Sequence, residues 1–394
     1  MKHDLRLLAL LAAVMLLIAA CGGDATDTTA ASITTGAAEE TTTTEAVGEE
    51  TTTTEAVGEE TTTTGAGGEV TAVKACFVTD LAGVDDRSFN AEGWRGVQDA
   101  EAAGYVEADP ILLESDVTED YQPNIDQCLS QGAQHIITNG FQLGDATKLN
   151  AEANPDVKFT IIDFSYDPDI ENVRELVYQT DEAAFAAGYL AAGVSQSGII
   201  GTYGGVNIPT VSIFLDGLAR GVAHHNEVKG TDVQVIGWDI EAQDGSFTGT
   251  FDPADPAVRA LCESILDEGA DIILPVGGAI NLPCGTAILD RGIEAALIGV
   301  DADAFEAMPA EYQDLWLVTI EKGLAVQVTR SLEEDAAGTW SPGGTVGNLE
   351  NDAVGLSEYH SWADRVPPEL DAEVQQILAD IKSGTIDASF FEVG

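Results

Sequence analysis

The chain has 394 residues, and 68 Asp and Glu against 16 Lys and Arg give it a formal net charge of −52 at pH 7. Such an acidic surface repels phosphate backbones and anionic headgroups, which argues against nucleic acid as a partner. Hydrophobic residues make up 44% of the chain, too many for an acidic disordered polymer and enough for two domains with cores.

The first 21 residues have the pattern of an export signal. Lys2 and Arg6 form a basic start, and residues 7–20 are almost wholly apolar, a stretch too short to span a bilayer comfortably. The segment ends in a small-residue run before Cys21 that resembles a bacterial lipobox, which implies a lipid on the Cys21 thiol. An ordinary secretory signal with an incidental cysteine is the alternative. We therefore expect an exported chain, anchored by lipid on the extracytoplasmic face of the cell membrane and not spanning it.

Residues 22–70 predict a disordered tether rich in Thr, Glu and Gly. The ten-residue unit at 41–50 recurs without change at 51–60, and a third copy begins at Thr61. One Val per unit cannot bury a core, so the repeat is a low-complexity linker and not a solenoid. The linker is acidic and has no Lys or Arg, so it repels itself and extends.

The remaining residues, 71–394, alternate short β-branched strands with helical stretches. In chain order the pattern predicts strand 73–79, helix 88–103, strand 110–113, helix 121–131, strand 135–138, helix 145–153, strands 158–162 and 173–177, helix 181–195, strand 198–203, helix 209–226, strand 233–238, helix 256–268, strand 271–274, helix 285–291, strands 297–300 and 315–320, and helix 322–337. This alternation indicates parallel α/β sheets with right-handed crossovers. So many units fit two doubly wound lobes, with helices on both faces of each sheet, better than one sheet or a closed barrel.

Four cysteines lie in this folded part: Cys76, Cys128, Cys262 and Cys284. An even number in an exported chain predicts two disulfides, and three pairings are possible. We favour Cys76–Cys128 with Cys262–Cys284, because each pair then stays within one lobe. Zinc is the rival interpretation, but the spacings are wide and no histidine is near them, so we expect no metal.

The loop after the first strand carries several polar and aromatic residues. Asp80 follows the strand directly, and Ser88 or Asp86 can cap the next helix, which places Phe89 and Asn90 in its first turn. Ligands of open α/β sheets bind beyond the carboxyl ends of the strands. Phe89 can therefore stack on a planar ligand, although a hydrophobic staple explains it equally well.

Three later strands also end in charged residues. Asp163 follows strand 158–162, Asp301 follows 297–300, and Lys322 comes shortly after 315–320. Carboxylates at one sheet edge can accept hydrogen bonds from sugar hydroxyls or ring N–H groups, and Lys322 can pair with Asp301 or donate to a hydroxyl. The alternative for each Asp is a loop or helix-cap role. No nucleophile elbow, phosphate-binding loop or dinucleotide fingerprint is present, so the sequence predicts no enzyme and no cofactor.

The whole of this pattern resembles the basic membrane protein family. The resemblance begins with residues 80–90, which end in Asp86-Arg87-Ser88-Phe89-Asn90, and with Trp94 and Gly96. It continues, in order, through 159–163, 181–189, 204–209, Phe214 with Gly217, 269–273, 298–303 and 319–322. The family comprises lipoprotein substrate-binding components of ABC importers, including purine-nucleoside-binding members. It implies a two-lobed type I periplasmic-binding fold hinged by crossovers. The N-lobe would be 72–180 with 323–342, and the C-lobe 181–321 with 343–394.

The resemblance also implies roles for individual residues. Asp80, Phe89 and Asn90 would contact the base, Asp163 would help hold it, and Asp301 and Lys322 would grip the ribose. Gly277 and Gly278 match the family's glycine-rich ligand loop, but residues 281–284 depart from its pattern. A second aromatic residue that would cover the base from the C-lobe is not identifiable.

We therefore expect a substrate-binding protein of an ABC importer that binds a small polar ligand between its lobes, with a purine nucleoside as the favoured ligand. Its partners would be ABC permease subunits, and its only membrane contact the N-terminal lipid. A sensor lipoprotein and an importer component for a sugar or another metabolite are the alternatives. A nucleoside hydrolase needs a metal-binding knot of carboxylates close together in sequence, and none is present.

Overall fold

The computed structural model describes residues 70–391, so the expected signal, the lipid-bearing Cys21 and the tether lie outside the described residues. Within 70–391 the chain forms two six-stranded sheets, with the strand orders β13-β5-β4-β3-β1-β2 and β14-β12-β11-β10-β6-β7. Neighbouring strands are parallel throughout, except that β14 runs antiparallel to β12. The expected architecture of two doubly wound α/β lobes is confirmed. No helix among these residues has the length and apolar character that a membrane crossing requires.

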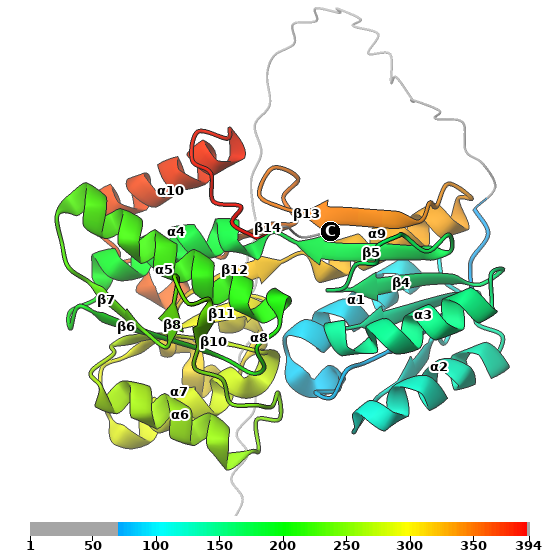
Figure 1. Ribbon diagram of the computed structural model, residues 1–394, viewed down its shortest axis with the longest axis horizontal. Coiled ribbons are helices and arrows are strands. Elements are labelled where there is room, and N and C mark those ends of the chain that lie inside the picture. Colours follow the sequence, from blue (N-terminus) through cyan, green and yellow to red (C-terminus); the bar gives the residue numbers. More distant parts are fainter. Residues whose placement is uncertain (1–69, 392–394) are drawn as a thin grey trace, which may run out of the picture. The chain divides into compact units, whose positions relative to one another are not determined.

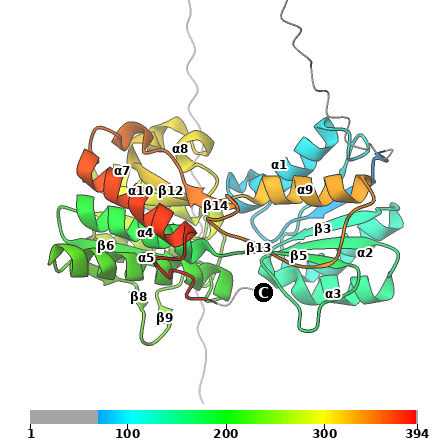
Figure 2. The ribbon, with the colours of Figure 1, turned by 90° about the horizontal axis from the view of Figure 1, so that it is seen from above.

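The first lobe is built mainly from the N-terminal half of the described chain. Its elements are β1 (Ala75–Val78), α1 (Phe89–Ala102), β2 (Ile111–Leu113), α2 (Tyr121–Ser130), β3 (His135–Asn139), α3 (Gly144–Ala153), β4 (Lys158–Ile162), β5 (Val173–Tyr178), α9 (Leu324–Ala336) and β13 (Gly343–Gly347). The central strands β1 and β3 are buried along their whole length, because helices cover both faces of the sheet. Figure 2 shows α1 and α9 on one face and α2 and α3 on the other.

The second lobe contains α4 (Thr180–Val194), β6 (Ile199–Gly204), α5 (Pro209–Lys229), β7 (Gln234–Ile236), β8 (Trp238–Asp239), β9 (Asp244–Gly245), α6 (Pro256–Asp267), β10 (Ile272–Val276), α7 (Asn281–Arg291), β11 (Ala296–Asp301), α8 (Ala304–Ala307), β12 (Trp316–Lys322), β14 (Val354–Leu356) and α10 (Pro368–Lys382). Helices α4, α5 and α10 cover one face of its sheet, and α6 and α7 cover the other (Figure 1). The short strands β8 and β9 form a separate hairpin.

Helices α4 and α5 pack so closely that their backbones touch. A Cβ added at Gly188 of α4 would overlap the carbonyl oxygen of Leu218, and one at Gly221 of α5 would overlap that of Phe185. Residues of α4 are buried around almost its whole circumference. Such a helix lies in the interior and has no solvent face.

Among the described residues, three segments cross between the lobes: β5 to α4, β12 to α9, and β13 to β14. The expected boundary at 342/343 differs from the structure. β13 pairs in parallel with β5 over 343–347, so the returning part of the first lobe includes this strand as well as the helix. The sequence of β13, Gly-Gly-Thr-Val-Gly, has too little β propensity to predict a strand.

Two other predictions were wrong in detail. The expected strand 233–238 is interrupted at Gly237, whose φ of 94° ends β7 and starts β8 on a new course. The helix expected from residue 285 begins at Asn281. The unusual stretch 281–284 is therefore the first turn of α7 and not an altered loop.

Each disulfide joins two elements of the same lobe. Cys76 of β1 is bonded to Cys128 of α2, and Cys262 of α6 to Cys284 of α7. These are the two pairs favoured from the sequence, and they occupy the thiols that a zinc site would have needed. The first bond fixes helix α2 to strand β1, and the second fixes helix α6 to the neighbouring helix α7.

Candidate functional site

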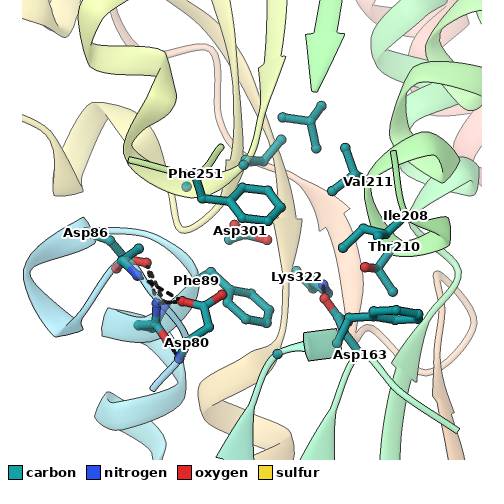
Figure 3. Close-up of a pocket in the computed structure, with 18 of the residues that line it drawn as sticks. Asp80, Asp86, Phe89, Asp163, Ile208, Thr210, Val211, Phe251, Asp301 and Lys322 are labelled. Carbon is teal, nitrogen blue, oxygen red and sulfur yellow. Dashed lines mark hydrogen bonds and ion pairs between the residues drawn. The ribbon is translucent and has the colours of Figure 1, made fainter. Parts of the chain in front are cut away.

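A cavity of about 600 Å³ lies between the lobes, where the carboxyl ends of strands from both sheets meet (Figure 3). Both lobes contribute to its wall. All the residues expected to bind ligand line it, namely Asp80, Phe89, Asn90, Asp163, Gly277, Gly278, Asp301 and Lys322. These residues are far apart in the sequence, and the fold brings them together beyond the carboxyl ends of the strands, where ligands of open α/β sheets bind.

Asp86, rather than Ser88, caps helix α1. Its carboxylate accepts hydrogen bonds from the backbone N–H groups of Ser88 (3.0 Å), Asn90 (2.8 Å) and Ala91 (2.9 Å). Arg87 has a φ of 56°, and this left-handed residue turns Asp86 back toward the helix start. The Ser88 hydroxyl makes no capping bond and is free to point elsewhere.

Asn90 holds Asp80 in place. Its Nδ2 donates to Asp80 Oδ1 at 2.6 Å, and its Oδ1 accepts from the Nδ2 of Asn139 at 2.9 Å. The backbone N–H of Ala82 also donates to Asp80 Oδ1. Burial raises the pKa of Asp80 to about 6, although the hydrogen bond from Asn90 opposes the shift. Asn90 is thus committed to positioning the Asp80 carboxylate at the cavity wall.

Lys322 and Asp163 form an ion pair across the two lobes. Lys322 Nζ, at the end of β12, donates to Asp163 Oδ2 at 2.6 Å, just beyond β4. The Lys322 ammonium also lies 4.9 Å from the ring centroid of Phe89 and 5.0 Å from that of Tyr178. Carboxylate and aromatic faces together stabilise its charge in this buried position.

Asp301, the last residue of β11, also lines the cavity. Asp163 and Asp301 have φ values of 65° and 69°, a left-handed conformation that Asp tolerates better than most residues and that bends the chain sharply at the strand end. The Oγ of Ser88 lies 2.9 Å from Asp301 Oδ2 and 3.1 Å from the Val300 carbonyl oxygen. Burial raises the pKa of Asp301 to about 6, against the opposing effect of the Lys322 charge.

Phe251 is the main aromatic cavity residue that the sequence did not predict. It lies in the loop between β9 and α6, and Figure 3 shows it across the cavity from Phe89. Gly205 and Gly277 make room for it, because a Cβ on either would press against its ring. No strand, helix period or motif surrounds Phe251 in the sequence, so only the chain's three-dimensional course reveals it. Phe214 of α5 and Asp86 also line the cavity.

Comparison with known proteins shows that the chain is similar to transport proteins over most of its described length. A family model described as "Bmp: ABC transporter substrate-binding protein PnrA-like" matches residues 73–386. The "ABC transporter nucleoside-binding protein BmpA" of Lactococcus lactis subsp. cremoris is 27% identical over 340 residues, which cover 80% of this chain and 89% of that protein. "Basic membrane protein A1" of Borrelia garinii subsp. bavariensis is 29% identical over 221 residues, covering 56% of this chain and 61% of that protein.

A solved structure shares the fold. The ABC transporter solute-binding protein from Aeropyrum pernix K1 superposes with a TM-score of 0.69 at 20% identity, covering 80% of this chain and 92% of that one. The two-lobed architecture with a cleft between parallel sheets is therefore that of the solute-binding proteins.

Proposed function

Because this chain belongs to the Bmp family of ABC transporter substrate-binding proteins, we propose that its cleft binds a purine nucleoside for import. The family consists of extracytoplasmic transporter components that bind a small molecule and are not enzymes. The nucleoside-binding name of the Lactococcus lactis relative supports the choice of ligand.

The observation that carries the proposal is that two aromatic rings and several carboxylates line the same cavity. Phe89 comes from the first lobe and Phe251 from the second. A planar base between these rings would stack on both, and each stacked ring contributes about 1–3 kcal/mol. Asp80 would accept hydrogen bonds from the N–H groups of the base, with Asn90 as its support.

The other end of the cavity suits a ribose. Asp301 would accept from the vicinal hydroxyls, and Lys322 would donate to one of them, while Asp163 bonds the Lys322 ammonium and the ligand's edge. Gly277 and Gly278 have no side chains and therefore keep the cavity wall beside Phe251 thin. Carboxylates outnumber the single ammonium of the cavity wall, so a phosphate group would be repelled. The site therefore favours nucleosides over nucleotides.

The two lobes would close on the ligand as units of 72–178 with 324–347, and 180–322 with 354–391. Residues 1–69 supply the anchor in this proposal, with the lipid on Cys21 and the repeat 41–60 as a spacer between membrane and lobes. ABC permease subunits would accept the closed form. Anchoring the binding protein to the membrane in this way keeps it near its permease at a high effective concentration.

A thermal-shift scan tests the ligand assignment. The purified chain is unfolded and refolded to remove carried ligand and then melted with inosine, guanosine, adenosine, ribose, free bases and nucleoside 5′-monophosphates. A ligand at about 1,000 times its dissociation constant adds about 4 kcal/mol of stability, which raises Tm by several degrees. We expect a shift with a nucleoside and none with ribose, free base or monophosphate. A shift with sugars alone would overturn the nucleoside assignment and leave the family role intact.

A further inference from the structure

A second chamber adjoins the ligand cavity on the side of the first crossover. It is open to solvent on one side and shares Phe141, Asp163, Thr210 and Lys322 with the cavity described above. Tyr178 and Thr180, which flank the crossover from β5 to α4, form part of its wall. In Figure 3 the shared residues Asp163 and Thr210 lie across the cavity from Asp80 and Asp86. The chamber is thus across the cavity from Asp80, and Lys322 on its wall lies 4.9 Å from the ring centroid of Phe89.

Three buried polar atoms on residues of this chamber have no hydrogen-bond partner among residues 70–391. They are Tyr178 Oη, Thr180 Oγ1 and Asp163 Oδ1. The three residues are 4%, 1% and 6% exposed. Buried polar groups in folded proteins nearly always find a partner, so three unpaired atoms on residues that line one cavity indicate a ligand group or ordered water. Asp163 Oδ2 already bonds Lys322, which leaves Oδ1 for such a group.

The chemistry of the chamber selects a neutral, hydroxyl-bearing occupant. The two hydroxyls can donate or accept, whereas the carboxylate oxygen can only accept. An anion would face the Asp163 carboxylate, and a cation would compete with Lys322 for the same acid. Phe141, Phe164 and Ile213 supply apolar wall for the carbon frame of the occupant.

Resting on the nucleoside assignment above, we propose that this chamber receives the 5′ end of the ligand. The vicinal diol of the ribose is held by Asp301 and Lys322, and the base occupies the aromatic slot, so the 5′-hydroxyl is the remaining polar group. Lys322 borders both spaces, which brings that hydroxyl to the chamber entrance. The site therefore binds nucleosides that carry a neutral, hydroxyl-bearing extension on the 5′ carbon, as well as unmodified ones.

Calorimetric titration of the full chain with three probes tests this proposal. The probes are inosine, 5′-deoxyinosine and inosine carrying a 2-hydroxyethyl ether at the 5′ oxygen. We expect the ether to bind within about threefold of inosine, and 5′-deoxyinosine to bind about tenfold more weakly, because one hydrogen bond to a buried group is lost.

Two conservative variants locate the effect. Tyr178→Phe removes only the hydroxyl and keeps the ring beside Lys322, and Thr180→Val keeps the shape of Thr180. We expect each variant to reduce the difference between inosine and 5′-deoxyinosine while 5′-deoxyinosine binding stays unchanged. Tyr203→Phe is the matched control, since Tyr203 is buried in the core of the second lobe, and it should preserve the tenfold difference.

The outcomes separate the two proposals. If inosine binds but the ether does not, or if the variants weaken inosine and 5′-deoxyinosine equally, the chamber assignment is wrong and the nucleoside assignment stands. If inosine, guanosine and adenosine all fail to bind, the nucleoside assignment and the chamber's role fall together.

Discussion

The Ser88 hydroxyl of the first lobe lies 2.9 Å from the Asp301 carboxylate of the second, so one side chain bridges the cleft. The bridge exists because Asp86 takes over the capping of α1 and releases Ser88. Arg87 adds a second link nearby, from its Nη1 to the carbonyl oxygen of Ala307. The start of α1 therefore both forms part of the ligand site and ties the lobes together.

Replacing Ser88 tests the importance of this link. We expect Ser88→Ala to weaken nucleoside binding about tenfold or more, since a hydrogen bond to a charged group contributes about 1.5–3 kcal/mol. Calorimetry gives the affinity, and small-angle scattering with ligand should show less compaction. Ser130→Ala, which removes an exposed hydroxyl bonded only to Gln127, is the control. Unchanged affinity and compaction in Ser88→Ala would show that the bridge has no role in closure.

The two stacking rings should contribute comparable binding energy. We expect Phe89→Ala and Phe251→Ala each to weaken binding about 10- to 100-fold, from the loss of one aromatic face each. Phe305→Ala, which removes a ring stacked on His360 away from the cavity lining, should bind normally. Circular dichroism melting checks that each variant folds. Wild-type affinity in Phe251→Ala would restrict stacking to the first lobe.

Binding should weaken as the pH falls below about 6. Burial raises the pKa of Asp80 and of Asp301 to about 6, and a ligand that donates hydrogen bonds to them favours their ionised forms. Protonation therefore competes with binding, by up to tenfold per pH unit for each carboxylate. Titrations from pH 5 to 8 measure this dependence. In Asp301→Asn the slope should be smaller, and an equal slope would assign the effect to other groups.

The stability of the empty protein should change with pH in the opposite sense. The pKa of Asp80 is about 6 in the folded protein against an ordinary value of 3.8, so the folded form holds a proton that the unfolded chain has released. The contribution of this proton to the free energy of unfolding is fully present below about pH 4 and is lost as the pH rises to about 6. The difference in free energy of unfolding between Asp80→Asn and wild type, measured in urea, should grow over that interval. A difference independent of pH would contradict it.

Both disulfides should matter for stability. In the chain-entropy model, a link across 22 residues is worth about 3 kcal/mol and one across 52 residues about 4 kcal/mol. Urea unfolding of the paired variants Cys262→Ala with Cys284→Ala, and Cys76→Ala with Cys128→Ala, measures these losses. Alkylation of the unfolded wild-type protein without reductant should label none of these thiols, and labelled cysteines would contradict both bonds.

Much of the site followed from one regularity of parallel sheets. Asp80 and Asp163 follow strands of the first sheet, and Asp301 and Lys322 end strands of the second. Strands of one parallel sheet end at a common edge, so the grouping within each lobe was predictable. The helix cap was not, because Asp86 and Ser88 are both good capping residues and only backbone geometry decides between them. Phe251 depends on the course of an irregular loop.

Parts of the fold beyond residue 337 were less predictable. β13 is glycine-rich and owes its strand conformation to its partner β5. Helix α10 is different, because its buried residues Leu370, Val374, Ile377 and Ile381 have helical spacing and Pro368 is at its start. The sequence alone therefore carries the signal for α10.

The tight contact between α4 and α5 has a mechanical meaning. α4 begins at Thr180, where the chain leaves the first lobe, and α5 begins at Pro209, beside Thr210 and Val211 of the cavity wall. Since the backbones of the two helices touch at Gly188 and Gly221, α4 and α5 can move as one rigid body that rotates about the crossover. A rotation at this crossover would therefore carry Thr210 and Val211 of the cavity wall together with α4, and a larger side chain at Gly188 or Gly221 would force the two helices apart.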